Sequence, residues 1–318
     1  MKFTITIPSD KSRYLNEAIE SVISQTYPQW ELIIVDDHSP EDLHSIVRPY
    51  LSDQRIRYYR NSANCGAENV VDNWNICLSH ATGQYIICIG DDDRLKPTCL
   101  TEYCQLIRKY PGLGVYHGRT QIIDEDGTPK YTQKERPEWE SAISLLWNRW
   151  SNRPDQYIGD FCYDTQQLRK QGGYYKLPLA WGSDDISAVR AAADKGIANT
   201  ISTVFEYRQN RYTITRSNYS RIKMQASLAA HEWFSKFIQQ QHNNPNISDS
   251  DRQYLTSINS ACRTYYYKSL GKNCADDLRG NPLKILFWHK SLERFHFTAA
   301  TYLKWYLKSI YNLIFSTP

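Results

Sequence analysis

The 318-residue chain has no apolar run of the roughly 18 residues that a helix needs to span a bilayer, so we expect no membrane-spanning segment. Its first eight residues, MKFTITIP, alternate apolar and polar side chains and are too few for a signal peptide; they predict a first strand instead. Internal repeats and low-complexity tracts are also missing. With 41% hydrophobic and 23% charged residues, the composition predicts a globular protein, with the cytoplasm as its default compartment.

Paired cysteines are absent as well. None of the eight cysteines forms a CxxC pair, and their spacing matches no zinc pattern. Cys77 and Cys88 lie in apolar stretches and are interpreted as small core residues. Free thiols are typical of the cytoplasm, so the cysteines point to packing.

The charge balance is only +4, too small for a polyanion binder, and we expect no nucleic-acid partner. The distribution is uneven. Residues 281–318 contain five basic side chains and one acidic side chain, and therefore carry as much net charge as the whole chain.

Apolar runs and helical spacing alternate through the first hundred residues. Strands are expected at residues 3–7, 31–35, 55–59 and 85–89, with helices between them. This order predicts an α/β fold with a parallel sheet covered by helices. Ligands of such sheets bind beyond the carboxyl ends of the strands.

Polar clusters follow three of these strands: Pro8-Ser9-Asp10, Asp36-Asp37 and Asp91-Asp92-Asp93. We expect them to meet in one crevice. Three adjacent carboxylates repel one another unless a hard cation such as Mg²⁺ or Mn²⁺ neutralises them together with phosphate oxygens. The alternative for the acidic run alone is a solvated turn.

The remaining chain divides into a mixed part and a helical part. A strand is expected at residues 115–121, and helices at residues 165–171, closed by Gly172, and 183–193. Beyond residue 219 the pattern predicts helices at 222–240, 248–270 and 282–315. We place a boundary near Asn218, which gives a catalytic domain (1–218, with halves 1–100 and 101–218) and a helical region (219–318).

Two stretches resemble the N-terminal signatures of family 2 glycosyltransferases. They are SVISQTYPQWELIIVDDHS at residues 21–39, and ATGQYI at residues 81–86 followed by GDDD at 90–93 and by Pro97. The match is strong over about residues 3–100 and weaker to about residue 215, through Gly172-Gly173 and the run WGSDD at 181–185. The last hundred residues resemble no family that we can name.

The resemblance implies a GT-A fold and inverting transfer of a sugar. The donor would be a nucleotide-diphosphate sugar of the UDP or dTDP type, and the acceptor a hydroxyl of a glycan or lipid-linked molecule. Bacterial surface polysaccharide synthesis is the role expected of the family. The implied cofactor is a divalent cation, Mn²⁺ or Mg²⁺.

The resemblance also implies roles for particular residues. Counted back from Pro97, Asp92 takes the metal-binding position of the DXD motif, with Asp93 after it as a second candidate. Asp185 matches the general base, with Asp184 as the fallback. Nucleotide-binding positions are implied for Pro8, Ser9, Asp10, Asp36, Asp37 and Asp91.

Two positions depart from the family pattern. Gly90 stands where the first motif Asp is usual, and Trp74 stands where an Arg is frequent ahead of Asn75. A positive contact to the diphosphate would then come from another residue: Arg94, Arg119 or Arg211.

Other readings stay open at several positions. As first-turn helix residues, Asp184 and Asp185 are also ordinary capping residues. Trp181 is predicted to stack on the acceptor sugar, or else it packs in the core. Arg208, after the expected strand, could approach phosphates or lie in a solvated loop.

A last amphipathic pattern lies near the C-terminus, where apolar residues recur at helical spacing among lysines. One interpretation is an interfacial helix on an anionic membrane, at the inner face of the plasma membrane, where a lipid-linked acceptor would be found. The other is packing on the catalytic domain or on a second subunit as a homodimer. The residues of this pattern are Leu292, Phe295, Ala299, Tyr302, Leu303, Tyr306, Ile310 and Leu313, with Trp288, Trp305 and Tyr311.

Two rival functions remain. A sugar nucleotidyltransferase would carry a Gly-rich loop with Lys or Arg after the first strand, and residues 7–11 (IPSDK) lack the glycines. A module that only binds a nucleotide sugar or glycan is the rival outside the enzymes. Turnover distinguishes it from a transferase.

Overall fold

The computed structural model describes residues 1–151, 155–210, 219–280, 282–291 and 293–315. The chain forms two compact units. We call residues 1–176 with 183–211 the α/β unit, and residues 177–182 with 212–318 the helical unit. The boundary expected near Asn218 falls outside the described residues.

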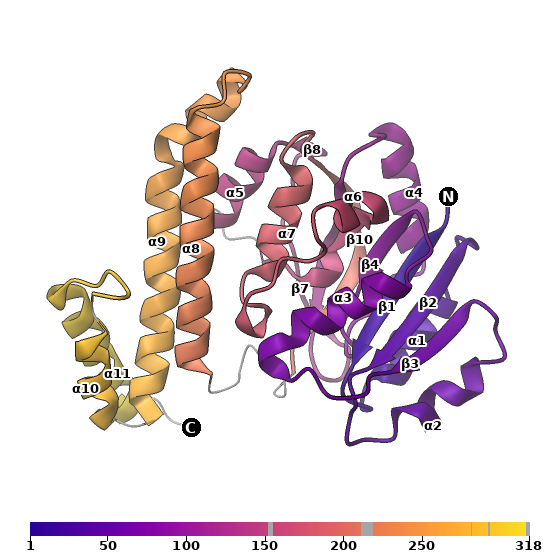
Figure 1. Ribbon diagram of the computed structural model, residues 1–318, viewed down its shortest axis with the longest axis horizontal. Helices are drawn as coiled ribbons and strands as arrows, with labels where there is room; N and C mark the ends of the chain where they lie inside the picture. The colour runs from indigo at the N-terminus through magenta and orange to yellow at the C-terminus, as the bar shows by residue number, and fades with distance from the viewer. Residues whose placement is uncertain (152–154, 211–218, 281, 292, 316–318) are drawn as a thin grey trace. The chain divides into compact units, whose positions relative to one another are not determined.

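The α/β unit opens with strands and helices in alternation, as expected (Figure 1). These elements are β1 (Phe3–Ser9), α1 (Leu15–Ile23), β2 (Trp30–Asp36), α2 (Leu43–Val47), β3 (Ile56–Arg60), α3 (Val70–His80) and β4 (Tyr85–Cys88). The rest of the unit contains β5 (Arg94–Leu95), α4 (Cys99–Lys109), β6 (Val115–Ile123), β7 (Pro129–Thr132), β8 (Trp139–Glu140), α5 (Ala142–Ser151), β9 (Phe161–Asp164), α6 (Thr165–Lys170), α7 (Ser183–Ala192) and β10 (Ile197–Arg208).

All the strands belong to one sheet in the order β3-β2-β1-β4-β9-β6-β10-β5, with β7 beside β6 and β8 beside β10. The parallel pairing expected from the sequence holds from β3 to β4. Beyond β4 the sheet is mixed, because β9 runs antiparallel to both of its neighbours while β6 and β10 are parallel. The fold is therefore GT-A-like: one curled sheet flanked by helices.

The registers of the central strands bring their carboxyl ends together. Ser9, the last residue of β1, pairs with Asp36, the last residue of β2. On the other side of β1, Thr6 pairs with Cys88, so the chain leaving β4 passes beside Ser9. Fully buried Ile, Leu and Val side chains hold these strands in the core, and this packing fixes where the polar clusters lie.

At the opposite end of the strands, Glu31 ties four segments together. Its carboxylate accepts hydrogen bonds from Lys2 (2.7 Å), Thr4 (2.6 Å), Arg57 (2.7 Å) and both the backbone and the side chain of Thr82 (2.7 Å each). Burial alone would raise the pKa of Glu31, but the hydrogen bonds outweigh it and lower the pKa to about 2.

Replacing Glu31 by Gln is expected to lower the free energy of unfolding by about 2 kcal/mol near neutral pH, after allowance for the exposed partners Lys2 and Arg57. Because the folded-state pKa lies below the unfolded value of 4.5, the stabilisation is complete above that value and disappears as pH falls towards 2. Urea unfolding of both proteins across this pH range measures the difference. The exposed Glu68→Gln serves as the control, and an equal loss at all pH values would contradict the prediction.

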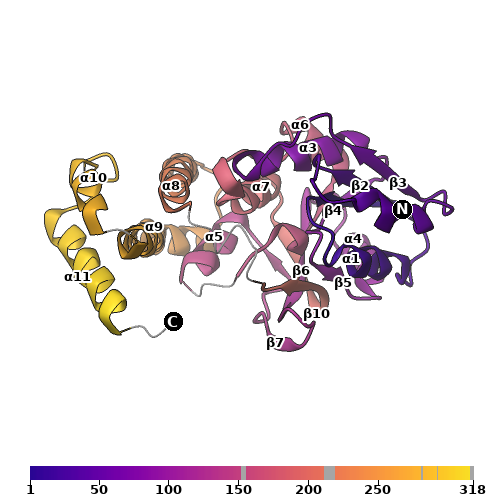
Figure 2. The ribbon, with the colours of Figure 1, turned by 90° about the horizontal axis from the view of Figure 1, so that it is seen from below.

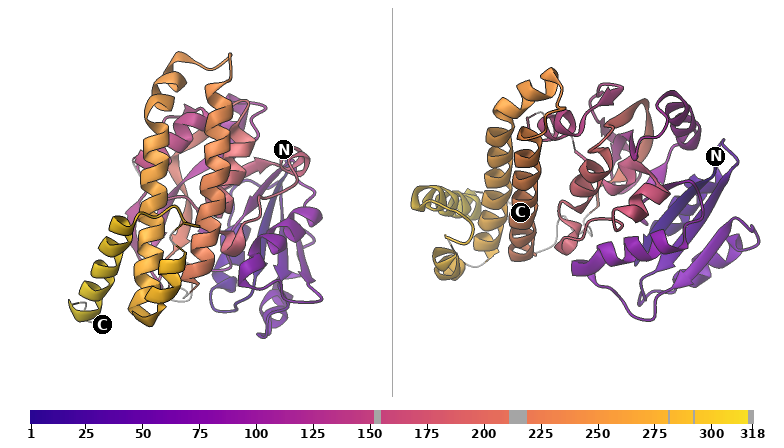
Figure 3. Two further views of the ribbon diagram at one scale, coloured as in Figure 1. Left: turned by 60° about the vertical axis from the view of Figure 1, so that its left-hand side comes forward. Right: turned by 45° about the horizontal axis from the view of Figure 1, so that its top comes forward.

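The helical unit is built on two long helices, α8 (Ser220–His242) and α9 (Asp249–Gly280), which run side by side (Figure 3). Helices α10 (Ile285–Lys290) and α11 (Ala299–Phe315) follow, and α11 packs on α9 (Figure 2). The short 3₁₀ turn η4 (Pro178–Ala180) also contacts α8. Within the described part of the chain, no helix combines the length and hydrophobicity needed to cross a membrane.

The expectation of one helical stretch from residue 282 to 315 is wrong, since the helix is interrupted between α10, which ends at Lys290, and α11, which begins at Ala299. Phe295 and Phe297 are both buried, at 2% and 8% exposure, in the same apolar cluster as Trp288 and Trp305. Residues two apart point in nearly opposite directions on a helix, so both can enter one core only where the chain is not helical. The expected helix at residues 248–270 is also longer, reaching Gly280.

Candidate active site

The end of β1 and the acidic run meet as the sequence predicted. One carboxylate oxygen of Asp91 accepts hydrogen bonds from the Ser9 hydroxyl (3.1 Å) and from the backbone N–H groups of Asp10 and Lys11 (2.9 Å each). Asp91 therefore fixes the loop after Pro8. Burial, partly offset by these donors, raises the pKa of Asp91.

The two acids after β2 take different positions. Asp36 is fully buried, and its carboxylate accepts bonds from Ser39 N (2.7 Å), Tyr58 Oη (2.5 Å) and Arg60 Nη1 (2.5 Å). These bonds make it a structural anchor for the loop.

Asp37 lies at the end of β1, where its N–H donates to the Ser9 carbonyl (2.8 Å). Its carboxylate accepts from Asn61 Nδ2 (2.8 Å) and Cys65 N (3.0 Å). Asp10 belongs to the same corner, since Asp91 and Asp37 add to the effect of burial in raising its pKa. Asp10, Asp37 and Asp91, which follow β1, β2 and β4, therefore lie close together.

Asp92 carries a carboxylate that can bind a cation. Its Oδ2 accepts a hydrogen bond from Asn210 Nδ2 (2.6 Å), just after β10. Burial and the charge of Asp91 raise the pKa of Asp92 to about 6, and a nearby cation would favour its ionised form.

No group of three or more His, Cys, Asp and Glu side chains suited to a metal occurs among the described residues. Mg²⁺ and similar hard cations often take only one or two protein oxygens and complete their shell with phosphates and water. The carboxylate of Asp92, which accepts its hydrogen bond from Asn210 Nδ2, fits such a sparse site.

Asp93 points inward. It is 3% exposed, and its two oxygens accept the backbone N–H groups of Arg208 (2.9 Å) and Gly90 (3.3 Å). With both oxygens engaged, Asp93 closes the turn after β4. A Cβ at position 90 would lie 2.8 Å from Asp92 Oδ1 and 2.9 Å from Asp93 Oδ2, so the glycine there lets the two carboxylates fold back over the turn.

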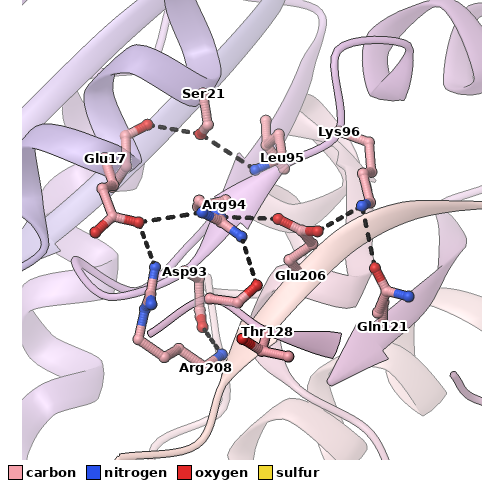
Figure 4. Close-up of polar contacts among 12 residues, drawn as sticks. Glu17, Ser21, Asp93, Arg94, Leu95, Lys96, Gln121, Thr128, Glu206 and Arg208 are labelled. Atoms are coloured by element: carbon pink, nitrogen blue, oxygen red, sulfur yellow. Dashed lines mark hydrogen bonds and ion pairs between the residues drawn. The ribbon is translucent and has the colours of Figure 1, made fainter. Parts of the chain in front are cut away.

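Arg208 lies beside Asp93 of the acidic run (Figure 4), not in a solvated loop and not free for phosphates as the sequence suggested. This last residue of β10 is fully buried. Its guanidinium donates to Glu17 Oε2 (2.6 Å), to the Asp92 carbonyl (2.8 Å) and to the Glu125 carbonyl (2.9 Å), and stacks 4.3 Å from the Tyr14 ring centroid.

Two of the three arginines considered for the diphosphate are already paired. Arg94 bonds to Glu206 (2.8 Å) and Glu17 (3.2 Å), as Figure 4 shows. Arg119 bonds to Glu135 (2.9 Å) and to the Gln133 carbonyl (2.9 Å). Arg211, the third, lies outside the described residues.

The second candidate acid site opens helix α7. Asp185 is 7% exposed, and Arg149 of α5 donates its Nε–H to both carboxylate oxygens (3.1 and 3.3 Å). Asp184 Oδ1 accepts a hydrogen bond from the backbone N–H of Asp185 (2.9 Å). Burial and the charge of Asp185 raise the pKa of Asp184 above its ordinary value.

Trp181 belongs to the helical unit, two residues before α7. Lys223 of α8 places its Nζ 5.1 Å from the Trp181 ring centroid, a cation–π distance. Trp181 is partly exposed, so part of its surface remains open to a ligand.

Known proteins resemble this chain in sequence and in fold. The family described as "Glycosyl transferase family 2" matches residues 5–174. Over 224 residues the chain is 30% identical to the putative teichuronic acid biosynthesis glycosyltransferase TuaG of Bacillus subtilis, covering 69% of this chain and 84% of TuaG. Matches to two further B. subtilis proteins span only 30% and 41% of their lengths.

Two solved structures share the fold. Residues 1–349 of Staphylococcus aureus TarS, crystallised with UDP-GlcNAc, align with a TM-score of 0.64 at 15% identity, covering 98% of this chain and 91% of that one. The mannosyltransferase PcManGT of Pyrobaculum calidifontis, in complex with GDP-Man and Mn²⁺, aligns with a TM-score of 0.52 at 14% identity, covering 100% and 88%.

Proposed function

Since the chain belongs to glycosyl transferase family 2, we propose that it transfers a sugar from a nucleotide-diphosphate sugar to an acceptor hydroxyl, with inversion. The observation that carries the proposal is the meeting of Ser9, Asp37 and Asp91 at the carboxyl ends of adjacent strands, with Asp92 next in the chain. Nucleotides bind at this edge in α/β sheets.

Asp37 and Asp10 are assigned to the base and the ribose. A carboxylate can accept hydrogen bonds from the N–H groups of a base and the hydroxyl groups of a ribose. Asp36 and Asp91 hold the loops that carry them, together with Pro8 and Ser9. Asp92, assisted by Asn210, would hold the divalent cation, Mn²⁺ or Mg²⁺. A bound cation would supply positive charge to the diphosphate leaving group. Asp93 is assigned to the turn beneath this site.

Asp185 is assigned as the general base. The acceptor oxygen bonds to the anomeric carbon from the face opposite the diphosphate, the bond from that carbon to the phosphate oxygen breaks, and the hydroxyl proton passes to Asp185. Arg149 orients the carboxylate through its Nε–H. Asp184, whose raised pKa favours its protonated form, is the fallback for this role.

The substrates are proposed from the relatives. TuaG is named for teichuronic acid synthesis, and the TarS structure contains UDP-GlcNAc. A UDP- or dTDP-linked donor and a glycan or lipid-linked acceptor in bacterial surface polysaccharide synthesis follow by analogy. Trp181 is proposed to stack on the acceptor sugar. We place the enzyme in the cytoplasm, with peripheral contact to the inner face of the plasma membrane; a homodimer through the C-terminal helices is the alternative.

A screen of nucleotide sugars tests the function. Purified protein, Mn²⁺ and each donor are incubated with a panel of glycan and lipid-linked acceptors, and release of nucleoside diphosphate is measured. Turnover of one donor supports the proposal. Metal-dependent binding without turnover would point to a binding-only module, and neither binding nor turnover with any donor would refute the proposal.

Asp92→Asn is expected to lower kcat/KM about 100-fold and to raise the Mn²⁺ concentration needed for half-maximal rate, because the cation loses its charged protein ligand. A Mn²⁺ titration of the initial rate measures both effects. Asp126→Asn removes an exposed acid from a nearby turn and is the matched control. An unchanged Mn²⁺ requirement in Asp92→Asn would contradict the assignment.

A further inference from the structure

Helix α11 has two apolar faces. Tyr302, Trp305 and Ser309 are buried against the rest of the helical unit, at 8%, 9% and 3% exposure. On the opposite side, Leu303 and Leu307 are each 56% exposed. Residues four apart lie one above the other on a helix, so these two leucines form an outward apolar ridge, which exposed Tyr311 extends. We call Leu303, Leu307 and Tyr311 the outer ridge.

Two lysines follow the ridge along one side. Lys304 and Lys308 each come one residue after a ridge leucine, which turns them about 100° around the helix. They are exposed and lie between the outer ridge and the face that carries Thr301 and Trp305. A helix with this order presents apolar atoms outward and cations along the border, as interfacial helices do.

A cavity of about 410 Å³ that is wide open to the surface adjoins this lysine row and is lined by residues of α9 and α11. Its eight lining residues are three bases, three hydroxyl residues and two aromatic residues: Arg263, Lys268, Lys304, Ser260, Thr264, Thr301, Tyr267 and Trp305. This set of donors suits a phosphate group, since guanidinium, ammonium and hydroxyl groups all donate to phosphate oxygens.

The basic side chains of this cavity differ from others in the same unit in their ion pairing. Lys284 pairs with Asp277 (2.5 Å). Among the described residues, no ion pair joins Arg263, Lys268 or Lys304 to a carboxylate, although Arg263 does stack on Tyr267 at 5.5 Å. Three cations gathered at one concave site repel one another, and an anion relieves that repulsion.

We propose that the helical unit docks on a bilayer of anionic phospholipid, with a lipid phosphate in the cavity and the outer ridge in the acyl boundary. Charge selects this occupant. A second copy would bring an identical cationic surface, because residues 281–318 carry +4, and like charges disfavour that pairing. Anionic lipid complements both the cavity and the lysine row. This docking is the peripheral membrane contact of the proposed function, but it does not depend on catalysis.

Vesicle flotation tests the proposal with the full chain and no sugar substrate. We expect binding to vesicles of equal parts phosphatidylcholine and phosphatidylglycerol, weakened by salt, and little binding to phosphatidylcholine alone. The triple variant Arg263→Gln, Lys268→Gln, Lys304→Gln should bind about 100-fold more weakly, at roughly 5-fold per cation. The variant Leu303→Ser, Leu307→Ser should lose about 10-fold or more.

Matched variants separate these effects from general ones. Lys170→Gln, Lys236→Gln, Arg252→Gln removes the same charge from exposed sites elsewhere, and Ile201→Ser removes an apolar side chain that is 62% exposed on β10. Both should bind as wild type. The assignment of a lipid phosphate to the cavity would be overturned if the two triple variants weakened vesicle binding equally, or if binding did not depend on phosphatidylglycerol.

Molar mass is measured in solution without lipid for the wild type and the leucine variant. A wild-type dimer that Leu303→Ser, Leu307→Ser dissociates, together with no vesicle binding, would assign the ridge to a second copy and overturn the proposal. Because flotation needs no donor or acceptor, its failure leaves the proposed transferase activity untouched, and a failed donor screen leaves the lipid site untouched.

Discussion

Asp185→Asn is expected to reduce kcat about 1000-fold while KM for the donor changes little. General bases contribute roughly 10²–10⁴-fold, and an amide cannot accept the acceptor proton. Asn has nearly the shape of Asp and still offers an oxygen to Arg149, whose Nε lies 3.1 Å from the carboxylate. The loss should therefore appear in the chemical step, which single-turnover measurements of sugar transfer isolate.

Asp184→Asn is the matched control, one residue away in the same helical turn. Because burial and the charge of Asp185 raise the pKa of Asp184 and favour its uncharged form, we expect most of the activity to survive. The opposite pattern, with Asp184→Asn inactive and Asp185→Asn active, would exchange the two roles. Circular dichroism and thermal unfolding of both variants show whether the protein remains folded.

The position of the proposed nucleotide site, around Ser9, Asp37 and Asp91, could be predicted because it follows from local sequence patterns. The strands β1, β2 and β4 are rich in apolar residues, and an acidic residue follows within three positions of the end of each; parallel strands place their carboxyl ends at one edge of the sheet. The bond network of Asp91 with Ser9 and Asp10 follows from that arrangement. The family resemblance then supplied roles that spacing alone leaves open.

Other features depend on contacts between distant parts of the chain. Arg149 reaches Asp185 across 36 residues and Asn210 reaches Asp92 across 118, and no local pattern marks either partner. The antiparallel position of β9 between β4 and β6 is a similar case. A signal did exist for the break before α11, since Phe295 and Phe297 are two residues apart and cannot share one helical face.

Arg208 shows how a pattern can be seen and misinterpreted. It follows a β-rich run, so a phosphate contact or a solvated loop seemed natural from the sequence. The structure makes it the last residue of β10, with a side chain that is 1% exposed. A buried guanidinium needs partners for its donors, and here the Asp92 and Glu125 carbonyls and the Glu17 carboxylate provide them.

Arg208→Met is therefore expected to lower the free energy of unfolding by about 3 kcal/mol or more. Removing the guanidinium leaves the Asp92 and Glu125 carbonyls without their donor in a buried setting, while Met fills much of the volume. Activity should fall as well in the fraction that folds, and more Mn²⁺ should be needed, because the backbone of the cation ligand Asp92 loses its support. Arg208→Lys keeps the charge but not the fork of donors and should be intermediate.

Urea unfolding and a Mn²⁺ titration of the same samples separate the two consequences for Arg208. The matched control is Arg55→Met, because Arg55 also pairs with an acid, Asp53 (2.7 Å), and stacks on a ring, Trp30 (3.8 Å), but its side chain is 42% exposed. An exposed ion pair contributes about 1 kcal/mol or less, so this control should unfold nearly as wild type does. If Arg208→Met were as stable as Arg55→Met and kept the wild-type Mn²⁺ requirement, the acidic run would be held by Asp93 and its backbone donors alone, and the arginine beside it would be dispensable.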